Sequence, residues 1–325
     1  MRKHTWWQGA ALFVAALASA GSALAQTWPA KTVTLVVGSA PGSAPDVYAR
    51  VVAEPLARIL GQQVIVENRT GANGNVAAEF VARSNPDGYT LWVPAQSQIE
   101  TNPSAYADLR WKPADFTGVI KGAEAPVVLV VHPSVPAKTL PELVAWVKAN
   151  PGKVSYGSFS PGTASHFLGY QLNERYGLDM THVTFRGSGP QVQNLVGGHV
   201  PLGFSQIQTG LPHIKAGKLV PIATTSATRW RQLPDTPTMA ELGLKDFTAT
   251  TWFGIVAPSQ TPPDVLAKLV DAAKKAHADP VVKAKLEEMG FDVPAQTGAE
   301  LAASIREGSE RWAKLVKATG FKATD

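Results

Sequence analysis

From residue 32 onward, the chain alternates short β-branched segments with amphipathic segments of helical periodicity. Thr32–Val37 is a run of strand-forming residues, and Asp46–Leu60 places apolar residues at helical spacing before a glycine, which is a typical helix stop. The alternation continues with expected strands at Gln63–Val66 and Tyr89–Val93 and an expected helix at Gly74–Ala82. This β-α-β-α-β order predicts a parallel sheet with helices on both faces.

The alternation restarts at Val127–Val131, which is apolar and strand-like. The segments that follow are expected helices at Leu140–Ala149, Ala164–Tyr176, Pro190–Val196 and Leu211–Ala216, and expected strands at His182–Phe185, Val200–Phe204 and Leu219–Thr224. A second α/β unit therefore follows the first along the chain.

The end of the chain has a different order, with one strand-like segment before three helices. These segments are Trp252–Ala257, Pro263–Ala278, Val281–Met289 and Gly298–Thr319. We interpret this tail as returning to complete the first unit, so that the chain crosses between units near Gly122–Ala125 and again near Thr248–Thr251. Two crossings make a hinge that allows closure around a ligand.

The predicted architecture is therefore an α/β protein of two lobes, each with a mixed, mostly parallel sheet flanked by helices. Residues 26–124 and 251–325 are expected to form lobe 1, and residues 125–250 are expected to form lobe 2.

Residues 1–25 have the order of a secretory signal peptide. Arg2 and Lys3 precede an apolar run at 10–18, and Ala23–Ala25 forms an A-x-A cleavage site. The apolar run is too short to cross about 30 Å of hydrocarbon, which takes about 20 residues. We therefore expect cleavage after Ala25 and export to the periplasm. Because no Cys lies near the site, a lipoprotein anchor is excluded.

Composition and motifs argue against several classes of protein. The chain has 0 Cys and a formal charge of +5, and its charges are mixed along stretches such as Lys283–Glu288, which is typical of a solvated surface and not of a nucleic-acid-binding stripe. The 7 His form no metal-binding pattern, and neither G-x-G-x-x-G nor the P-loop motif occurs. Ser158–Gly162 is not a G-x-S-x-G elbow, and no acidic residue has a spacing that would orient His166. The sequence thus predicts no metal, no cofactor and no catalysis.

The richest candidate for a binding site is the loop Gly38–Asp46, between the first strand and the first long helix. A helix N-terminus has unpaired N–H groups and a partial positive charge, so it favours anions. Small residues here allow a ligand to approach the backbone closely. The candidate ligand-binding residues of this loop are Ser39, Ala40, Gly42, Ser43 and Ala44. The alternative is an ordinary capped turn with Asp46 as the N-cap.

Two loops of the second unit also join a strand to a helix, Tyr156–His166 and Phe185–Pro190, and two further polar loops follow strands, Pro94–Gln98 and Ser205-Gln206. Because ligands of open parallel sheets bind at the carboxyl ends of the strands, we expect these loops to face the first one. Their candidate ligand-binding residues are Gln96, Ser158, Ser160, Thr163, Arg186, Gly187, Ser188, Ser205 and Gln206. Local capping and loop solvation are the alternatives.

A series of motifs in the same order is found in a known family. The motifs are Pro29–Val37, Val66–Asn75, Pro86–Thr90, His182–Pro190, Leu211–Lys218, Leu233–Thr238 and Trp252–Gly254. Together they resemble the solute receptors of tripartite tricarboxylate transporters, also called the Bug family, over nearly the whole chain after residue 25. The resemblance implies a periplasmic, two-lobed Venus-flytrap fold without catalysis, small carboxylates as ligands, and a membrane permease with one large and one small subunit as partner.

The resemblance also implies which residues bind the ligand. The loop Ser39–Pro45 is expected to hold a carboxylate, partly through ordered waters, and Ser160, Thr163 and Gly187–Gly189 are expected to oppose it. Two places depart from the family pattern. Ser43 and Pro45 replace a glycine and a threonine, and Pro45 lacks a backbone donor.

The second departure is Ser205-Gln206, which replaces a common Asp-Asn pair and so lessens repulsion of a second anionic group. We therefore expect a monomeric receptor for a small organic carboxylate, either a dicarboxylate or an aromatic carboxylate. The alternative is a receptor whose liganded form signals to a two-component membrane sensor.

Overall fold

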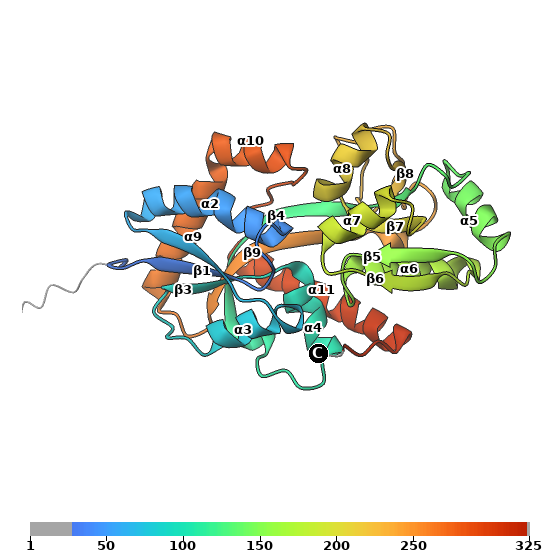
Figure 1. Cartoon of the computed structure of the whole chain (residues 1–325). Helices are drawn as coiled ribbons and strands as arrows, with labels where there is room; N and C mark the ends of the chain where they lie inside the picture. Colours follow the sequence, from blue (N-terminus) through green and yellow to red (C-terminus); the bar gives the residue numbers. More distant parts are fainter. Residues whose placement is uncertain (1–27, 324–325) are drawn as a thin grey trace, which may run out of the picture.

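The computed structural model describes residues 28–323, which form two α/β halves joined by a pair of long strands (Figure 1). The expected signal peptide lies outside the described residues. Within the described part of the chain, no helix combines the length and the apolar character needed to cross a bilayer.

The first half contains a parallel group of strands that is extended by antiparallel ones. β1 (Val33–Val37) pairs in parallel with β2 (Val64–Asn68) and with β3 (Thr90–Val93). β9 (Thr250–Pro258) lies antiparallel between β3 and β4 (Phe116–Val131). The helices of this half are α2 (Ala44–Leu60), α3 (Asn75–Ala82), α9 (Pro263–Ala278) and α10 (Pro280–Glu288). α2 ends at Gly61, whose φ of 67° is the left-handed conformation that glycine adopts readily.

The second half repeats this arrangement around the other end of β4. β5 (Ser155–Ser158) pairs in parallel with β6 (Thr181–Thr184) and with β7 (Leu202–Gln206). The last part of β4, Val127–Val131, lies antiparallel to β7 and to β8 (Val220–Thr224), and it is apolar throughout because it is buried on both faces. The helices are α5 (Leu140–Lys148), α6 (Ala164–Tyr176), α7 (Ser188–Val196) and α8 (Ile207–Lys215).

β4 and β9 form an antiparallel ribbon that connects the halves (Figure 1). The pairing runs from Phe116 opposite Pro258 to Pro126 opposite Thr250. Gly254 permits the close approach of the two strands, because an added Cβ would stand 2.3 Å from a carbonyl oxygen of β4. The two expected crossings lie on or beside this ribbon, and the assignment of residues to lobes stays a prediction.

The last helix, α11 (Gly298–Thr319), packs against elements of both halves (Figure 1). It contacts β4, the π-helix at Ser97–Thr101 and α4 (Asn102–Ala105), and it also contacts α6. Trp312 of α11 lies in the core of the second half, with its ring centroid 5.8 Å from that of Phe167. The tail of the chain therefore contributes to the second half as well as to the first.

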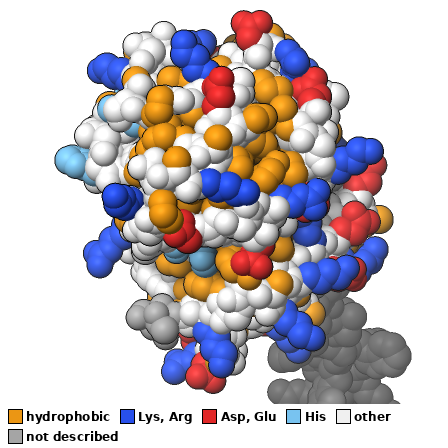
Figure 2. All heavy atoms as spheres, turned by 90° about the vertical axis from the view of Figure 1, so that its right-hand side faces the viewer, with side chains coloured by type: hydrophobic (Ala, Val, Ile, Leu, Met, Phe, Trp, Pro, Cys, Tyr) orange, Lys and Arg blue, Asp and Glu red, His pale blue; other side chains and the backbone are white. Residues whose placement is uncertain are grey.

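Figure 2 shows the outer end of the second half, where Lys and Arg side chains are interspersed with Asp and Glu side chains among uncharged ones. Both signs of charge are present on this face. Such a mixture is typical of a solvated surface, as the charge pattern of the sequence indicates.

Candidate ligand-binding site

A cavity of about 790 Å³ lies between the two halves, at the carboxyl ends of their parallel strands. The loops after β1, β2 and β3 line it from the first half. The loops after β5 and β6 and the last residue of β7, Gln206, line it from the second. Thr251 and Phe253 of β9 add to its wall. A cavity of this size suits a small molecule.

The loop after β1 is fixed by hydrogen bonds to the buried carboxylate of Asp46, which does not line the cavity. Asp46 accepts the backbone N–H of Gly42 at 2.8 Å, and Arg50 donates to both of its oxygens at 3.0 Å. Asn68 donates to Asp46 Oδ1 and to the carbonyl oxygen of Ser39, each at 2.9 Å. Burial opposes ionisation, but these hydrogen bonds outweigh it and keep the pKa of Asp46 below its ordinary value. The loop is therefore preorganised before any ligand binds.

The loop after β2 has a strained backbone that faces the cavity. Ala72 and Asn73 have φ values of 44° and 49°, which residues with a side chain rarely adopt. Asn102 steadies this turn, because it accepts from Asn73 Nδ2 at 3.0 Å and donates to the Asn73 carbonyl oxygen at 3.1 Å. At Gly74, with φ 88°, an added Cβ would stand 2.3 Å from the amide nitrogen of Gln98. Strain that is maintained by such contacts is common at binding sites.

Hydroxyl groups order the loops of the second half. Thr163 donates to the carbonyl oxygen of Ser160 at 2.7 Å, and its Oγ1 lies 2.9 Å from Ser165 Oγ. Ser165 Oγ also accepts the N–H of Phe159 at 3.1 Å. The loop after β6 is joined to this loop, because the N–H of Gly187 donates to the Phe159 carbonyl oxygen at 2.8 Å.

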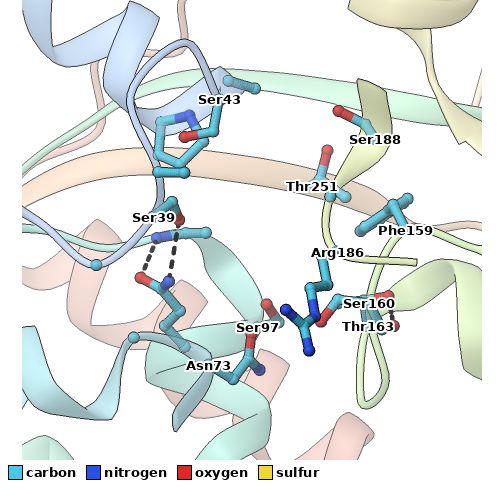
Figure 3. A pocket seen from close by; sticks show the side chains of 18 of the residues that line it. Ser39, Ser43, Asn73, Ser97, Phe159, Ser160, Thr163, Arg186, Ser188 and Thr251 are labelled. Carbon is cyan, nitrogen blue, oxygen red and sulfur yellow. Dashed lines mark hydrogen bonds between the residues drawn. The ribbon is translucent and has the colours of Figure 1, made fainter. Parts of the chain in front are cut away.

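Arg186 is the only charged residue among the described residues that line the cavity. Its guanidinium extends from the second half toward Ser97 of the first, on the side where Ser160 and Thr163 lie (Figure 3). Within residues 28–323 this exposed side chain forms no hydrogen bond and no ion pair. A free guanidinium can bind a carboxylate with two parallel N–H donors.

The N-termini of α2, α6 and α7 border the cavity, and their first residues, Ala44, Ala164 and Ser188, line it. Each helix start carries a partial positive charge. The first turns of α6 and α7 contain no acidic residue, whereas that of α2 contains Asp46. The second half is therefore the more positive wall. Ser43, and not Asp46, is the N-cap of α2.

The remaining wall combines aromatic rings and side-chain amides. Phe159, Phe185 and Phe253 offer apolar surface, while Asn73 and Gln96 offer amide groups. A positively charged end, polar groups and apolar surface together suit an organic acid with a hydrocarbon body.

The structure brings most of the predicted site residues to the cavity wall. These are Ser39, Ala40, Ser43, Ala44, Gln96, Ser160, Thr163, Arg186, Gly187, Ser188 and Gln206. The other three do not line it. Gly42 turns its N–H toward Asp46. Ser158 and Ser205 are fully buried in their strands, and Ser205 points away because neighbouring strand residues face opposite sides.

Other lining residues were missed by sequence analysis. Thr70–Gly74 follows β2, a strand that the sequence predicts, so the same carboxyl-end rule could have identified it. Thr251 and Phe253 lie within β9, and no local motif marks a mid-strand residue as part of a cavity wall.

A serine–histidine contact in the second half lies outside the cavity lining. Ser158 Oγ is 2.7 Å from His182 Nε2, and the ring of His182 stacks on His166 with centroids 4.1 Å apart. Burial lowers the pKa of both histidines to about 4. None of the three lines the cavity. Nowhere in residues 28–323 do three His, Cys, Asp or Glu side chains gather in a way that could hold a metal ion.

Comparisons with known proteins agree with this geometry. A model of the tripartite tricarboxylate transporter family receptor matches residues 48–321. BugT of Bordetella pertussis is 33% identical over 313 residues, which cover 96% of each chain. A solved protein of R. palustris with adipate is 31% identical with a TM-score of 0.84, over 91% of this chain and 99% of that one. MatC from Rhodopseudomonas palustris, with bound malate, is 33% identical with a TM-score of 0.81, over 89% of this chain and 100% of that one.

The solved periplasmic binding protein BugD is 32% identical with a TM-score of 0.82, over 91% of this chain and 100% of that one, which confirms the expected two-lobed α/β fold of a periplasmic binding protein. The family match also identifies the chain as a solute receptor and not an enzyme. The chain belongs to the tripartite tricarboxylate transporter receptor family, also called the Bug family.

Proposed function

We propose that this receptor captures a small dicarboxylate in the cavity between its halves. The observation that carries the proposal is the guanidinium of Arg186, which has no partner within residues 28–323 and faces the first half across the cavity. One ligand carboxylate binds Arg186 and the N-termini of α6 and α7. The other binds the Ser39 and Ser43 hydroxyls and the start of α2, as the loop Gly38–Asp46 suggests.

The ligands of the solved relatives support this chemistry. Adipate and malate both carry two carboxylates, although they differ in length and in the hydroxyl group of malate. The cavity of about 790 Å³ has room for either. Phe159, Phe185 and Phe253 would contact the hydrocarbon part, so an aromatic dicarboxylate also fits this wall.

Family membership supports a receptor in the periplasm that delivers its ligand to a membrane permease with a large and a small subunit. The order of residues 1–25 supports export. The alternative partner is a two-component membrane sensor. Deleting the receptor gene separates the two, because loss of ligand uptake supports the permease, whereas normal uptake with lost gene induction supports the sensor.

Titration calorimetry with adipate, malate and an aromatic dicarboxylate tests the proposed ligand class, with glucose as the negative control. We expect at least one dicarboxylate to bind. Arg186→Gln should weaken it by about ten- to a hundredfold, because a hydrogen-bonded charge pair is lost.

Arg175→Gln, an exposed arginine of α6 that does not line the cavity, is the matched control and should bind like the wild type. Binding of glucose without binding of any dicarboxylate would reject the proposal. Unchanged affinity in Arg186→Gln would reject the role of Arg186.

A further inference from the structure

A buried carboxyl group lies directly behind the cavity wall. Glu100, in the π-helix at Ser97–Thr101, is 3% exposed and does not line the cavity. Gln96, about one turn earlier, does line it, and Gln96 Nε2 donates to Glu100 Oε2 at 2.8 Å. The Gln96 amide therefore lies between Glu100 and the cavity.

The other polar side chains close to the Glu100 carboxyl group within residues 28–323 are indole groups. Trp252 of β9 donates from Nε1 to Glu100 Oε1 at 2.7 Å, and the indole of Trp312 of α11 also favours the ionised form of the carboxyl group. An indole N–H can donate but cannot accept. On the remaining side α11 passes very close, since a Cβ added at Gly308 would stand 2.3 Å from the Glu100 carboxyl group.

The charged groups around Glu100 come from the ribbon and from α11. Lys121 of β4 and Arg311 of α11 both attract the ionised carboxylate. Each has a further acidic neighbour, because Lys121 pairs with Glu124 at 2.6 Å and Arg311 is attracted by Asp246. These cations favour the ionised form of Glu100, while its burial favours the protonated form.

The Gln96 amide is the one hydrogen-bonding neighbour of Glu100, among those described, that contains an acceptor. When Glu100 is ionised, it accepts from Gln96 Nε2, and Gln96 Oε1, which has no protein partner within residues 28–323, is left for the cavity. When Glu100 is protonated, its buried O–H needs an acceptor, and among these side-chain neighbours the Gln96 amide supplies one if it is reversed. The NH₂ group of Gln96 then faces the cavity.

We propose that the protonation state of Glu100 sets which end of the Gln96 amide faces the ligand, so that Glu100 is a positioning residue that makes carboxylate binding proton-dependent. The inference rests on the proposed carboxylate-binding function. Protonated Glu100 presents an N–H donor to a carboxylate. Ionised Glu100 presents a carbonyl oxygen, which repels a carboxylate.

The acidity of Glu100 places this change near neutral pH. Burial raises the pKa of Glu100 to about 7, against the lowering effects of the hydrogen bonds from Gln96 and Trp252 and of the Lys121 charge. A carboxylate ligand favours the protonated form, so binding takes up protons. Affinity therefore rises as the pH falls through about 7.

Calorimetry with adipate between about pH 6 and about pH 8.5 tests the proposal, since adipate stays largely ionised over this range. For the wild type we expect binding about tenfold tighter at the acidic end, as one hydrogen bond to a charged group is gained. Buffers of different ionisation enthalpy should show proton uptake of up to about one per ligand near pH 7.

Glu100→Gln places a permanently neutral group at this position. Its carbonyl oxygen can accept from Trp252 while its NH₂ group donates to Gln96 Oε1, so it should bind adipate tightly at every pH of the range. Gln96→Met keeps the volume but removes the amide, and it should show neither pH slope nor proton uptake. Glu307→Gln, an exposed position on α11, is the matched control and should keep the wild-type profile.

A flat wild-type profile, or a slope that persists in Glu100→Gln, would overturn the role of Glu100 and leave the receptor proposal intact. Failure of adipate, malate and an aromatic dicarboxylate to bind at any pH would overturn the proposed function itself. Thermal unfolding establishes that each variant is folded. Gln96→Met tests the coupling between Glu100 and the ligand from the cavity side. If adipate affinity still depends on pH in that variant, the proposal is overturned even if Glu100→Gln does not fold.

Discussion

At the scale of single residues, two arginines near the cavity differ in what they contact. Arg50 donates to both oxygens of Asp46 behind the loop after β1, so its charge stabilises the framework. Arg186 faces the cavity and forms no hydrogen bond or ion pair within the described chain. Arg186 follows β6 closely in sequence, whereas Arg50 lies within α2, and only the three-dimensional pairing shows which of them is free for a ligand.

Gly74 is a residue whose substitution should affect binding directly. Gly74→Ala combines a side chain at φ 88° with a Cβ that would stand 2.3 Å from Gln98 Nε2, so the lining loop must shift. Adipate affinity measured by calorimetry should fall by about tenfold or more.

Gly243→Ala is the matched control for this substitution. Gly243 has a similar φ of 84°, but no atom lies within 4 Å of its added Cβ, and it does not line the cavity. Gly243→Ala should lose stability through backbone strain, as Gly74→Ala does, but it should keep the wild-type affinity for adipate. Equal affinities in the two variants would contradict the prediction.

At the scale of elements, helices with strong end signals are predicted well from sequence and the long ribbon is not. α6, α9 and α11 begin and end at the residues expected, because proline or glycine marks one of their ends. The first part of β4, Phe116–Pro126, contains glycines, charged residues and shifts of register, so it lacks the alternation of a strand. Its pairing with β9 is a long-range contact that local sequence does not contain.

The candidate site shows the same division between local and long-range information. Strand-to-helix loops such as Ser39–Ala44 and Arg186–Ser188 are predictable, because helix starts at the carboxyl ends of strands have a local signature. Ser158 was predicted to bind the ligand, but it does not line the cavity, because its hydroxyl group turns to His182 inside the sheet. The orientation of a strand-end side chain depends on packing that the sequence does not reveal.

The attachment of α11 to the second half gives a stability prediction. Trp312→Ala removes a 3%-exposed indole that packs on Phe167, so unfolding free energy measured by urea denaturation should fall by about 3–5 kcal/mol. Lys314→Ala, an exposed position on the same helix, should change it by less than about 0.5 kcal/mol. If the free energy of unfolding fell by less than about 1 kcal/mol in Trp312→Ala, the end of α11 would contribute little to the stability of the protein.

At the scale of the whole molecule, the cavity lies between halves that are joined by β4 and β9 and by the contacts of α11. We expect a ligand that bridges Arg186 and the loop after β1 to draw these halves together, because its two ends would bind opposite walls. The ribbon of β4 and β9 would then bend, and α11, which contacts both halves, would limit the amplitude of the movement.

Small-angle X-ray scattering should detect this closure. Saturating adipate is expected to lower the radius of gyration by about 1 Å, whereas glucose at the same concentration should leave it unchanged. An unchanged radius of gyration in a sample that calorimetry shows to be saturated would mean that the halves are already closed without ligand.

The position of Trp312 in the second core has a consequence for how such genes can be rearranged. A chimera that exchanges only residues 126–249 between relatives would pair one parent's Phe167 with the other parent's Trp312 and Phe321. Functional hybrids should therefore inherit residues 298–323 together with that central block. Recombination breakpoints that separate the two would create a mismatched interior, even where the ligand-contacting loops are untouched.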